Sequence, residues 1–125
     1  MRKIYLSRKS FEKFDEGRYI LYLNEEVVND YVPETGAGEE PAAPCVAYAY
    51  TGPEADGGTL IAADSANYDS FVAGLIRLEY SQNQVEAILC NQGDGSDEHL
   101  AEFNALQMYR KECKQVAAEV LARAS

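Results

Sequence analysis

The chain is poor in the side chains that most often carry catalysis or hold metal ions. It has one histidine, His99, and its three cysteines, Cys45, Cys90 and Cys113, lie far apart without a C-x-x-C motif. A serine or cysteine nucleophile usually needs a histidine base, and a structural zinc site needs four ligands at close spacing. These shortages disfavour nucleophilic hydrolases and zinc proteins, and they predict free, partly buried thiols in a reducing compartment.

Long apolar runs and basic stretches are also missing. No apolar run approaches the roughly 20 residues that cross a bilayer, and the charged segment 1–14 is followed by more charge where a signal peptide would be apolar. Eleven basic residues stand against 21 acidic ones, which gives a formal net charge of −10. A phosphate backbone gains little from such a surface. We therefore expect a cytoplasmic protein that binds neither nucleic acid nor membranes.

Motifs that cradle phosphate or activate a serine are absent. The sequence has no P-loop, no G-x-S-x-G and no G-x-G-x-x-G. Adjacent carboxylates occur only in predicted turns or at a helix start, where we expect them to be solvated surface groups, not acid–base catalysts. We expect no cofactor and no enzymatic activity. Adjacent pairs include Glu25/Glu26, Glu39/Glu40 and Asp97/Glu98.

What is present predicts one domain of the α+β class. The chain has 125 residues, of which 46% are hydrophobic and 26% charged, as in an ordinary soluble domain. Residues 1–62 form a β-rich half and residues 63–125 a helical half. We expect an N-terminal antiparallel β-sheet, built as a hairpin or meander, followed by three C-terminal α-helices.

The β-rich half is divided by turns and one long loop. Residues 18–23 and 27–32 are rich in β-branched and aromatic side chains, and the short polar turn between them predicts a β-hairpin. Residues 8–17 predict one helical turn or a polar loop. Residues 33–44, with three prolines and two glycines, predict an exposed and flexible loop. In the strand predicted at 45–51, alternate side chains are small, so we expect another element, for example a helix, to pack closely on that face.

The first two helices are predicted from their caps. Asp64 or Ser65 can cap a helix whose apolar positions recur every three or four residues. Ser81 followed by Gln84 makes a capping box, with Tyr80 before it as half of a hydrophobic staple. We therefore expect a second helix to begin at Ser81 and to end near residues 91–93.

The third helix is predicted to run from near Ser96 to about Arg123. Its acids lie early and most of its bases late, which suits the helix macrodipole. A helix of that length extends about 40 Å at 1.5 Å per residue, so we expect its end to project or fray. Its apolar stripe has heptad-like spacing and comprises Leu100, Phe103, Leu106, Tyr109, Cys113, Val116 and Val120.

One short stretch, "CNQGDGSDEHLAEF" at residues 90–103, concentrates possible metal ligands. The candidates are Asp94, Asp97, Glu98 and His99. They fit neither the spacing of a calcium loop nor the H-E-x-x-H zinc pattern. The alternative is that glycines end one helix, Asp94 or Ser96 caps the next, and acids occupy its first turn. We favour the capping role and keep metal binding or catalysis as the alternative.

Tyrosine is the one enriched residue type. The chain has nine tyrosines and no tryptophan, and most of them fall in predicted strands. Tyrosine buries a ring while its hydroxyl keeps a partner, so it serves both sheet interiors and interfaces. Two interpretations remain: aromatic β-structure alone, or a sheet face that binds another protein. The candidate partner-binding tyrosines of the strands are Tyr19, Tyr22, Tyr48 and Tyr50.

The second half carries a resemblance. "YTGPEADGGTLIAADSANYDSFVAGLIRLEYSQNQVEAILCN" and "EFNALQMYRKECKQVAAEV" resemble small, uncharacterised proteins encoded in the tail-gene regions of prophages, over roughly residues 48–118. The last helix is also similar to the C-terminal helix of tail-fibre-assembly accessory proteins. Those proteins often carry a tryptophan before a Tyr-Arg pair. Here Tyr109 and Arg110 form the pair without the tryptophan.

The resemblance implies a non-enzymatic, prophage-derived protein that binds another tail component, and it adds Tyr109 and Arg110 to the candidate partner-binding residues. Such a protein would be a tail or tail-fibre assembly accessory or a minor tail component, cytoplasmic or virion-associated. Two alternatives stand beside it. One is a small metal-binding protein or enzyme that uses the cluster around His99. The other is a homo-oligomeric structural protein whose partner is a second copy.

Overall fold

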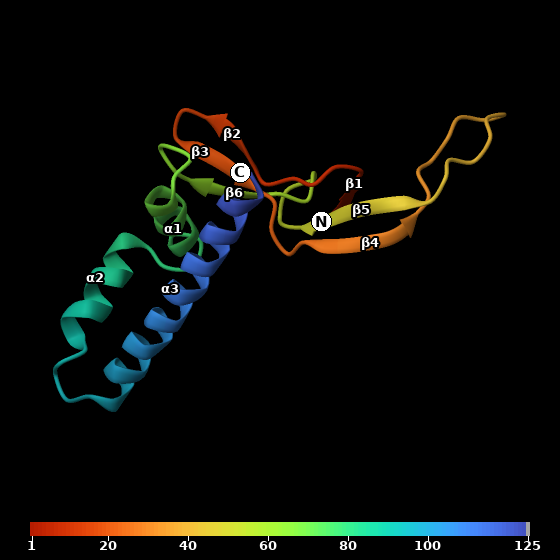
Figure 1. The fold of residues 1–125 in the computed structure, drawn as a ribbon. Helices are drawn as coiled ribbons and strands as arrows, with labels where there is room; N and C mark the ends of the chain where they lie inside the picture. Colours follow the sequence, from red (N-terminus) through yellow and green to blue (C-terminus); the bar gives the residue numbers. More distant parts are fainter. Residues whose placement is uncertain (125) are drawn as a thin grey trace.

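The computed structural model describes residues 1–124, which form six strands followed by three helices. All strands precede all helices, which is the predicted α+β arrangement (Figure 1). None of the helices described in this range is long and apolar enough to cross a membrane. The strands are β1 (Arg2–Tyr5), β2 (Phe11–Asp15), β3 (Arg18–Leu21), β4 (Glu26–Tyr31), β5 (Cys45–Thr51) and β6 (Thr59–Ala62), and the helices are α1 (Tyr68–Ile76), α2 (Gln82–Asn91) and α3 (Asp97–Arg123).

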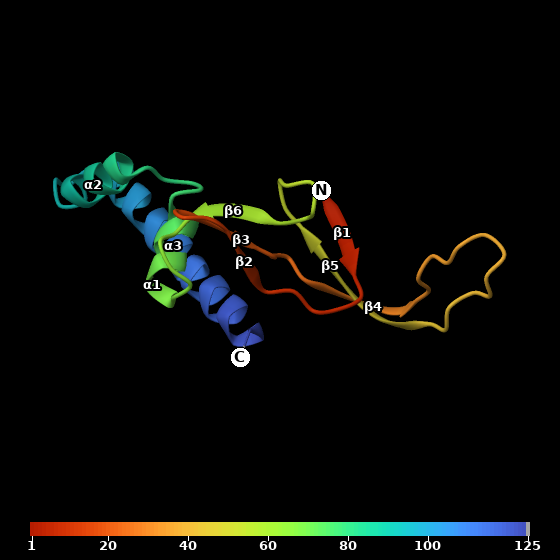
Figure 2. The ribbon, with the colours of Figure 1, turned by 90° about the horizontal axis from the view of Figure 1, so that it is seen from above.

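The strands form two antiparallel sheets, in the orders β1-β5-β4 and β2-β3-β6. Because β3 pairs with β6 and β4 pairs with β5, residues 18–31 and 45–62 make one long bent ribbon. The loop of residues 32–44 lies at the tip of this ribbon, at one end of the molecule (Figures 1 and 2). β1 is added beside β5, and β2 is added beside β3.

The predicted hairpin between residues 18–23 and 27–32 is wrong, because the chain continues there from one sheet into the other. At the bend, Asn24 has a left-handed backbone with φ of 55°. Its side-chain nitrogen donates a hydrogen bond to Thr51 O at 3.0 Å, and the Thr51 N–H donates to Leu23 O at 3.2 Å. These bonds hold the chain beside its partner strand, so it changes sheet without reversing.

Residues 8–17 do not form a helical turn, since they contain strand β2. The Phe11 ring packs edge-on against Phe71 of α1, with 5.2 Å between ring centroids, and it also contacts Tyr19 of β3 at 6.1 Å. The strand is mostly charged, but this one aromatic side chain attaches it to the core. The formation of strand β2 therefore depends more on contacts with distant residues than on the hydrophobic pattern of its own sequence.

The core lies between the sheet β2-β3-β6 and the helices α1 and α3, while α2 packs on α3 further out (Figures 1 and 2). Its side chains are aliphatic and aromatic, as the apolar stripes of the helices predict. All three cysteines carry free thiols, and one of them belongs to this core. The buried cluster comprises Tyr19, Leu21, Ile61, Ala63, Phe71, Val72, Leu75, Ile76, Cys113, Ala117 and Val120.

The last helix does project from the rest of the molecule, but with its N-terminal half and not with its C-terminal end. The C-terminal end of α3 is anchored, because Val120 is fully buried and the Arg123 side chain is 3% exposed. The first half of α3 instead extends beyond the sheets, antiparallel to α2 (Figure 1). Residues 80–108 therefore form a helical hairpin at the end of the molecule opposite the loop 32–44.

The small side chains of β5 are not covered by a helix, contrary to the prediction. Ala47 and Ala49 are at most 1% exposed, but Val28 and Ile4 lie directly opposite them on the neighbouring strands. In the part of the chain that the structure describes, the helices pack on the other sheet.

Helix α1 starts later than the predicted caps. Its N-cap is Asn67, whose side-chain oxygen accepts the Ser70 N–H at 2.8 Å. Ser65 is placed two residues earlier, where its hydroxyl oxygen accepts a 2.6 Å hydrogen bond from the Asn67 side-chain amide. The prediction of Asp64 or Ser65 as the cap is therefore wrong by two or three residues.

Helix α2 starts as predicted. The Ser81 hydroxyl oxygen accepts the Gln84 N–H at 3.1 Å, and the Gln84 side-chain oxygen accepts the Ser81 N–H at 2.7 Å. Both bonds of the capping box are formed, and such a cap stabilises a helix by about 1 kcal/mol. The helix ends at Asn91, which also agrees with the prediction.

Shortening the loop at residues 32–44 is expected to change stability little. Residues 34–41 are all exposed, and Gly36 and Glu39 are hydrogen-bonded to each other within the loop. Closing a shorter loop changes the entropy of folding only slowly with length. Replacing residues 34–43 by a short glycine-containing turn should therefore alter the free energy of unfolding in urea by less than about 1 kcal/mol. A loss several times larger would show that the loop packs on the sheet.

Candidate functional site

The acids around His99 build the start of α3. Ser96 is the N-cap, and its hydroxyl oxygen accepts the His99 N–H at 3.3 Å. Asp94 accepts the Ser96 N–H at 2.9 Å with one carboxylate oxygen, and its other oxygen lies 2.5 Å from His99 Nδ1. The imidazole is one-third exposed and folds back onto this carboxylate, with no bond to Cys90. Both predicted caps thus take part in the turn.

The four candidate metal ligands are not gathered around one point. Asp97 and Glu98 are exposed in the first turn of α3, where their charges suit the helix dipole. Hydrogen bonds from the Ser96 N–H and from His99 hold the pKa of the Asp94 carboxyl below its ordinary value. Within residues 1–124, no group of three or more histidine, cysteine or acidic side chains is placed to hold a metal ion. The geometry here is that of a helix cap.

Three tyrosines predicted to contact a partner are buried. Tyr19, Tyr22 and Tyr50 are 8%, 2% and 0% exposed. The Tyr22 hydroxyl donates to the Asp56 carboxylate at 3.0 Å, and the Tyr50 hydroxyl donates to the Glu25 carboxylate at 2.7 Å. The rings of all three pack against other aromatic rings, and the hydroxyls of Tyr22 and Tyr50 are hydrogen-bonded inside the protein, so these side chains present almost no surface to a partner in this fold.

The other three candidates lie nearer the surface. Tyr48 is half-buried in β5, in register with Val27, which is 55% exposed. Tyr109 donates its hydroxyl to Leu75 O at 2.8 Å and so joins α3 to α1. Arg110 is half-buried beside it. A partner-binding role for Tyr48 or Arg110 stays a prediction.

Glu25 is not solvated, contrary to what its position in a polar turn predicts. Its side chain is 9% exposed, and it lies between two arginines. Arg8 donates to both carboxylate oxygens at 2.9–3.2 Å, and Tyr50 donates at 2.7 Å. Arg123 Nη1 is 3.5 Å from the same carboxylate. We call these four side chains the Glu25 cluster.

The Glu25 cluster fastens the end of α3 to the seam between the two sheets. Arg123 Nη1 also donates to Lys9 O at 2.9 Å and to Tyr22 O at 2.8 Å. Its guanidinium lies over the Tyr50 ring, 5.7 Å from the centroid. Four segments that are distant in sequence therefore meet at one buried ion pair. No local pattern in the sequence marks this meeting.

The Glu25 carboxyl should make stability depend on acid pH. Burial by itself raises its pKa, but hydrogen bonds from Arg8 and Tyr50 and the charge of Arg123 outweigh burial and hold the pKa below its ordinary value. Stability from this carboxylate is therefore present above the ordinary pKa of about 4.3 and is lost as pH falls through the lower, folded-state pKa.

Urea unfolding of wild type and Glu25→Gln at a series of pH values below about 5 checks this expectation. The variant should be less stable near neutral pH and should lose less stability on acidification. Glu26→Gln is the control, since the side chain of this neighbouring residue is 61% exposed and its removal should change the dependence of stability on acid pH only slightly. Equal slopes for wild type and Glu25→Gln would contradict the assigned ion pair.

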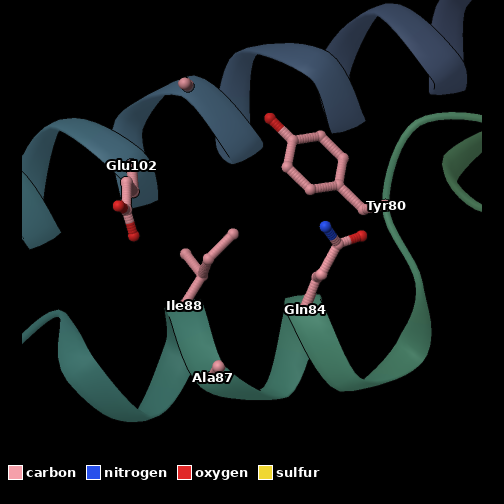
Figure 3. Close-up of a pocket in the computed structure, with 6 residues that line it drawn as sticks. Tyr80, Gln84, Ala87, Ile88 and Glu102 are labelled. Atoms are coloured by element: carbon pink, nitrogen blue, oxygen red, sulfur yellow. The ribbon is translucent and has the colours of Figure 1, made fainter.

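A groove with mostly apolar walls lies between α2 and α3 at the helical end. It has a volume of about 390 Å³ and is lined by Tyr80, Gln84, Ala87 and Ile88 beside α2 and by Glu102 and Ala105 on α3. Figure 3 shows Gln84 and Ile88 projecting from α2 toward α3, with Glu102 reaching from the opposite side. Space remains between the two helices where a core would normally close.

The hairpin around this groove exposes large apolar side chains and carries charge of one sign. Its exposed large hydrophobic residues include Leu89, Leu100 and Met108, which are 38–68% exposed. Residues 78–109 contain no lysine or arginine. The sequence signal for this site is therefore a stretch without lysine or arginine that contains the apolar stripes of two helices. The helix caps alone did not predict it.

No protein-family model matches this chain, and no curated protein or solved structure is significantly similar to it. The resemblance to prophage tail-region proteins accordingly stays a prediction.

Proposed function

We propose that the protein is a non-enzymatic protein-interaction module that binds its partner in the groove between α2 and α3. The observation that carries this proposal is the exposure of α2. None of the ten residues described in this helix is buried, although a helix so short is only marginally stable in water by itself. A partner in the groove would bury the apolar side chains that α2 turns toward α3, and it would stabilise the hairpin.

The other polar clusters support a binding role over a catalytic one. Asp94 and His99 are engaged in capping α3, and Glu25 and Arg123 hold α3 to the sheets. In each case the side chains that could carry chemistry already have structural partners. The groove, in contrast, has apolar walls with one carboxylate, Glu102, which is a surface for recognition.

We further propose that the partner is a phage tail or tail-fibre component, and that the protein is an assembly accessory or a minor tail component. The support is the resemblance of residues 48–118 to proteins of prophage tail-gene regions. That range includes α1, α2 and most of α3, and therefore the whole groove. The products of neighbouring genes are the first partners to test.

Co-expression of the tagged chain with each neighbouring gene product tests the proposal. Ala105→Arg places a long charged side chain in the groove at an exposed position, so the helix can accommodate it. We expect wild type to retain one partner through purification, and Ala105→Arg to retain at least about tenfold less, as when an interface centre is blocked.

The matched control is Ala118→Arg, which makes the same change at an exposed position of the same helix, outside the groove. It should retain the partner as wild type does. The proposal is wrong if no neighbouring product binds wild type at micromolar concentration. It is also wrong if both variants retain the partner equally.

A further inference from the structure

We infer that the occupant of the groove is a basic amphipathic α-helix supplied by the partner protein. The inference rests on the proposed function and adds the partner's secondary structure and charge. Two independent properties of the groove carry it: the spacing of its lining residues, and the absence of basic residues around it.

The shape of the groove fits a helix. Gln84, Ala87 and Ile88 recur at the spacing of one helix face, and Tyr80 lies just before the N-cap of the same helix. From Gln84 to Ile88 the helix rises about 6 Å at 1.5 Å per residue. The apolar positions i, i+3 and i+4 of an incoming helix span a similar length. A third helix in this place would complete a small bundle with α2 and α3.

Backbone chemistry excludes an added strand as the occupant. Both walls are helices, whose backbone N–H and C=O groups are already bonded within the helix, so an extended peptide would find no ladder to join. Ala87 and Ala105 are small, exposed lining residues on opposite walls. Small residues at a helix contact let a second helix approach closely, with its larger side chains between the ridges.

The charge of the groove selects a basic helix. Residues 78–109 hold six acidic residues and no lysine or arginine, so they carry six of the ten net negative charges of the chain. Glu102 lines the groove, and Glu98 lies one turn before it on the same side of α3. Lysine or arginine beside the apolar face of an incoming helix would pair with these carboxylates. The acids of the stretch are Glu79, Glu86, Asp94, Asp97, Glu98 and Glu102.

A second copy of the chain fits this groove poorly. Two identical hairpins meeting groove to groove would bring their acidic stretches together without a compensating base. The basic positions of α3 lie in its other half, where Cys113, Ala117 and Val120 face the core of their own molecule. The apolar face of this half of α3 cannot enter a neighbour's groove without leaving the core of its own molecule.

Peptide titration tests the inference on the full-length protein. Two fluorescent peptides of about 18 residues, long enough to form a helix, share the same leucine face and differ only in lysine or glutamate on the polar face. Anisotropy is measured for wild type, Glu102→Lys and the matched control Glu112→Lys, which changes the same charge at an exposed position outside the groove. Light scattering of the protein alone reports self-association.

We expect the basic peptide to bind wild type at least about tenfold tighter than the acidic one, with affinity falling as salt rises. Glu102→Lys should weaken it about tenfold, and Glu112→Lys by less than about threefold. Equal binding of both peptides overturns the basic partner but leaves the interaction module standing. No binding by either peptide overturns the helical occupant, while the co-expression test decides the module separately. A dimer that Ala105→Arg abolishes would place a second copy in the groove and overturn the inference.

Discussion

Replacing Glu25 by alanine is expected to lower the free energy of unfolding by about 3 kcal/mol, the scale of breaking a buried ion pair. The carboxylate is 9% exposed and faces Arg123, whose side chain is 3% exposed. Without it, a buried guanidinium keeps its bonds to backbone carbonyls and a 3.8 Å pair with the exposed Glu119, and the Tyr50 hydroxyl loses the nearer of its two acceptors, at 2.7 Å. Equilibrium unfolding in urea measures the loss.

The adjacent residue supplies the control. Glu26 has a 61% exposed side chain and pairs with Arg2 at 3.4 Å. Exposed pairs of this kind contribute less than about 1 kcal/mol, so Glu26→Ala should be nearly neutral. Equal losses for the two alanine variants would mean that the Glu25 cluster does not hold α3 to the sheets.

The second large effect is expected at Gly74, in the middle of α1. Helix propensity alone predicts that Gly74→Ala stabilises the protein by about 1 kcal/mol. The structure predicts the opposite sign, because a Cβ there would overlap the carbonyl oxygen of Ala62 and come within 3.0 Å of Ile61 Cδ1. The helix would have to move away from β6, at a cost of about 3 kcal/mol.

Ala73→Gly is the matched comparison, since this neighbouring residue is exposed on the same helix. It should lose about 1 kcal/mol from propensity alone. Thermal and urea unfolding of both variants should therefore show destabilisation in each, with Gly74→Ala the larger. A more stable Gly74→Ala protein would show that α1 does not rest on β6 as described.

The helices could be predicted because their signals are local. Ser81 and Gln84 lie three residues apart and satisfy each other, so the start of α2 follows from the sequence alone. The start of α3 follows from Asp94 and Ser96 in the same way. The apolar stripe of α3 also identifies Leu106, Cys113 and Val120, which are buried as expected.

The sheets could not be predicted, because their pairing depends on residues far apart in sequence. Propensity places strands near 18–23 and 27–32 but does not decide whether the chain reverses between them. The choice is made by Asn24 and its bond to Thr51, 27 residues away. Likewise, β2 exists because one aromatic residue, Phe11, reaches Phe71 of a later helix.

The same difference between local and distant contacts decides which candidate sites could be predicted. The capping role of Asp94 is local and was predictable. The burial of Glu25 depends on Arg8, Tyr50 and Arg123, which no spacing rule connects. The groove could not be predicted for another reason. Its apolar positions on α2 have the spacing of ordinary core positions, and only the structure shows that α3 leaves them open.

Hydrogen–deuterium exchange of the full chain, alone and with the basic amphipathic peptide, tests most directly whether the groove is the binding surface. α2 is short and exposed, so its amides should exchange quickly in the free protein. We expect the peptide to slow exchange in residues 80–108 and to leave exchange in β1, β4 and β5 unchanged. Protection in those strands, with exchange in α2 and the first half of α3 unaltered, would contradict it.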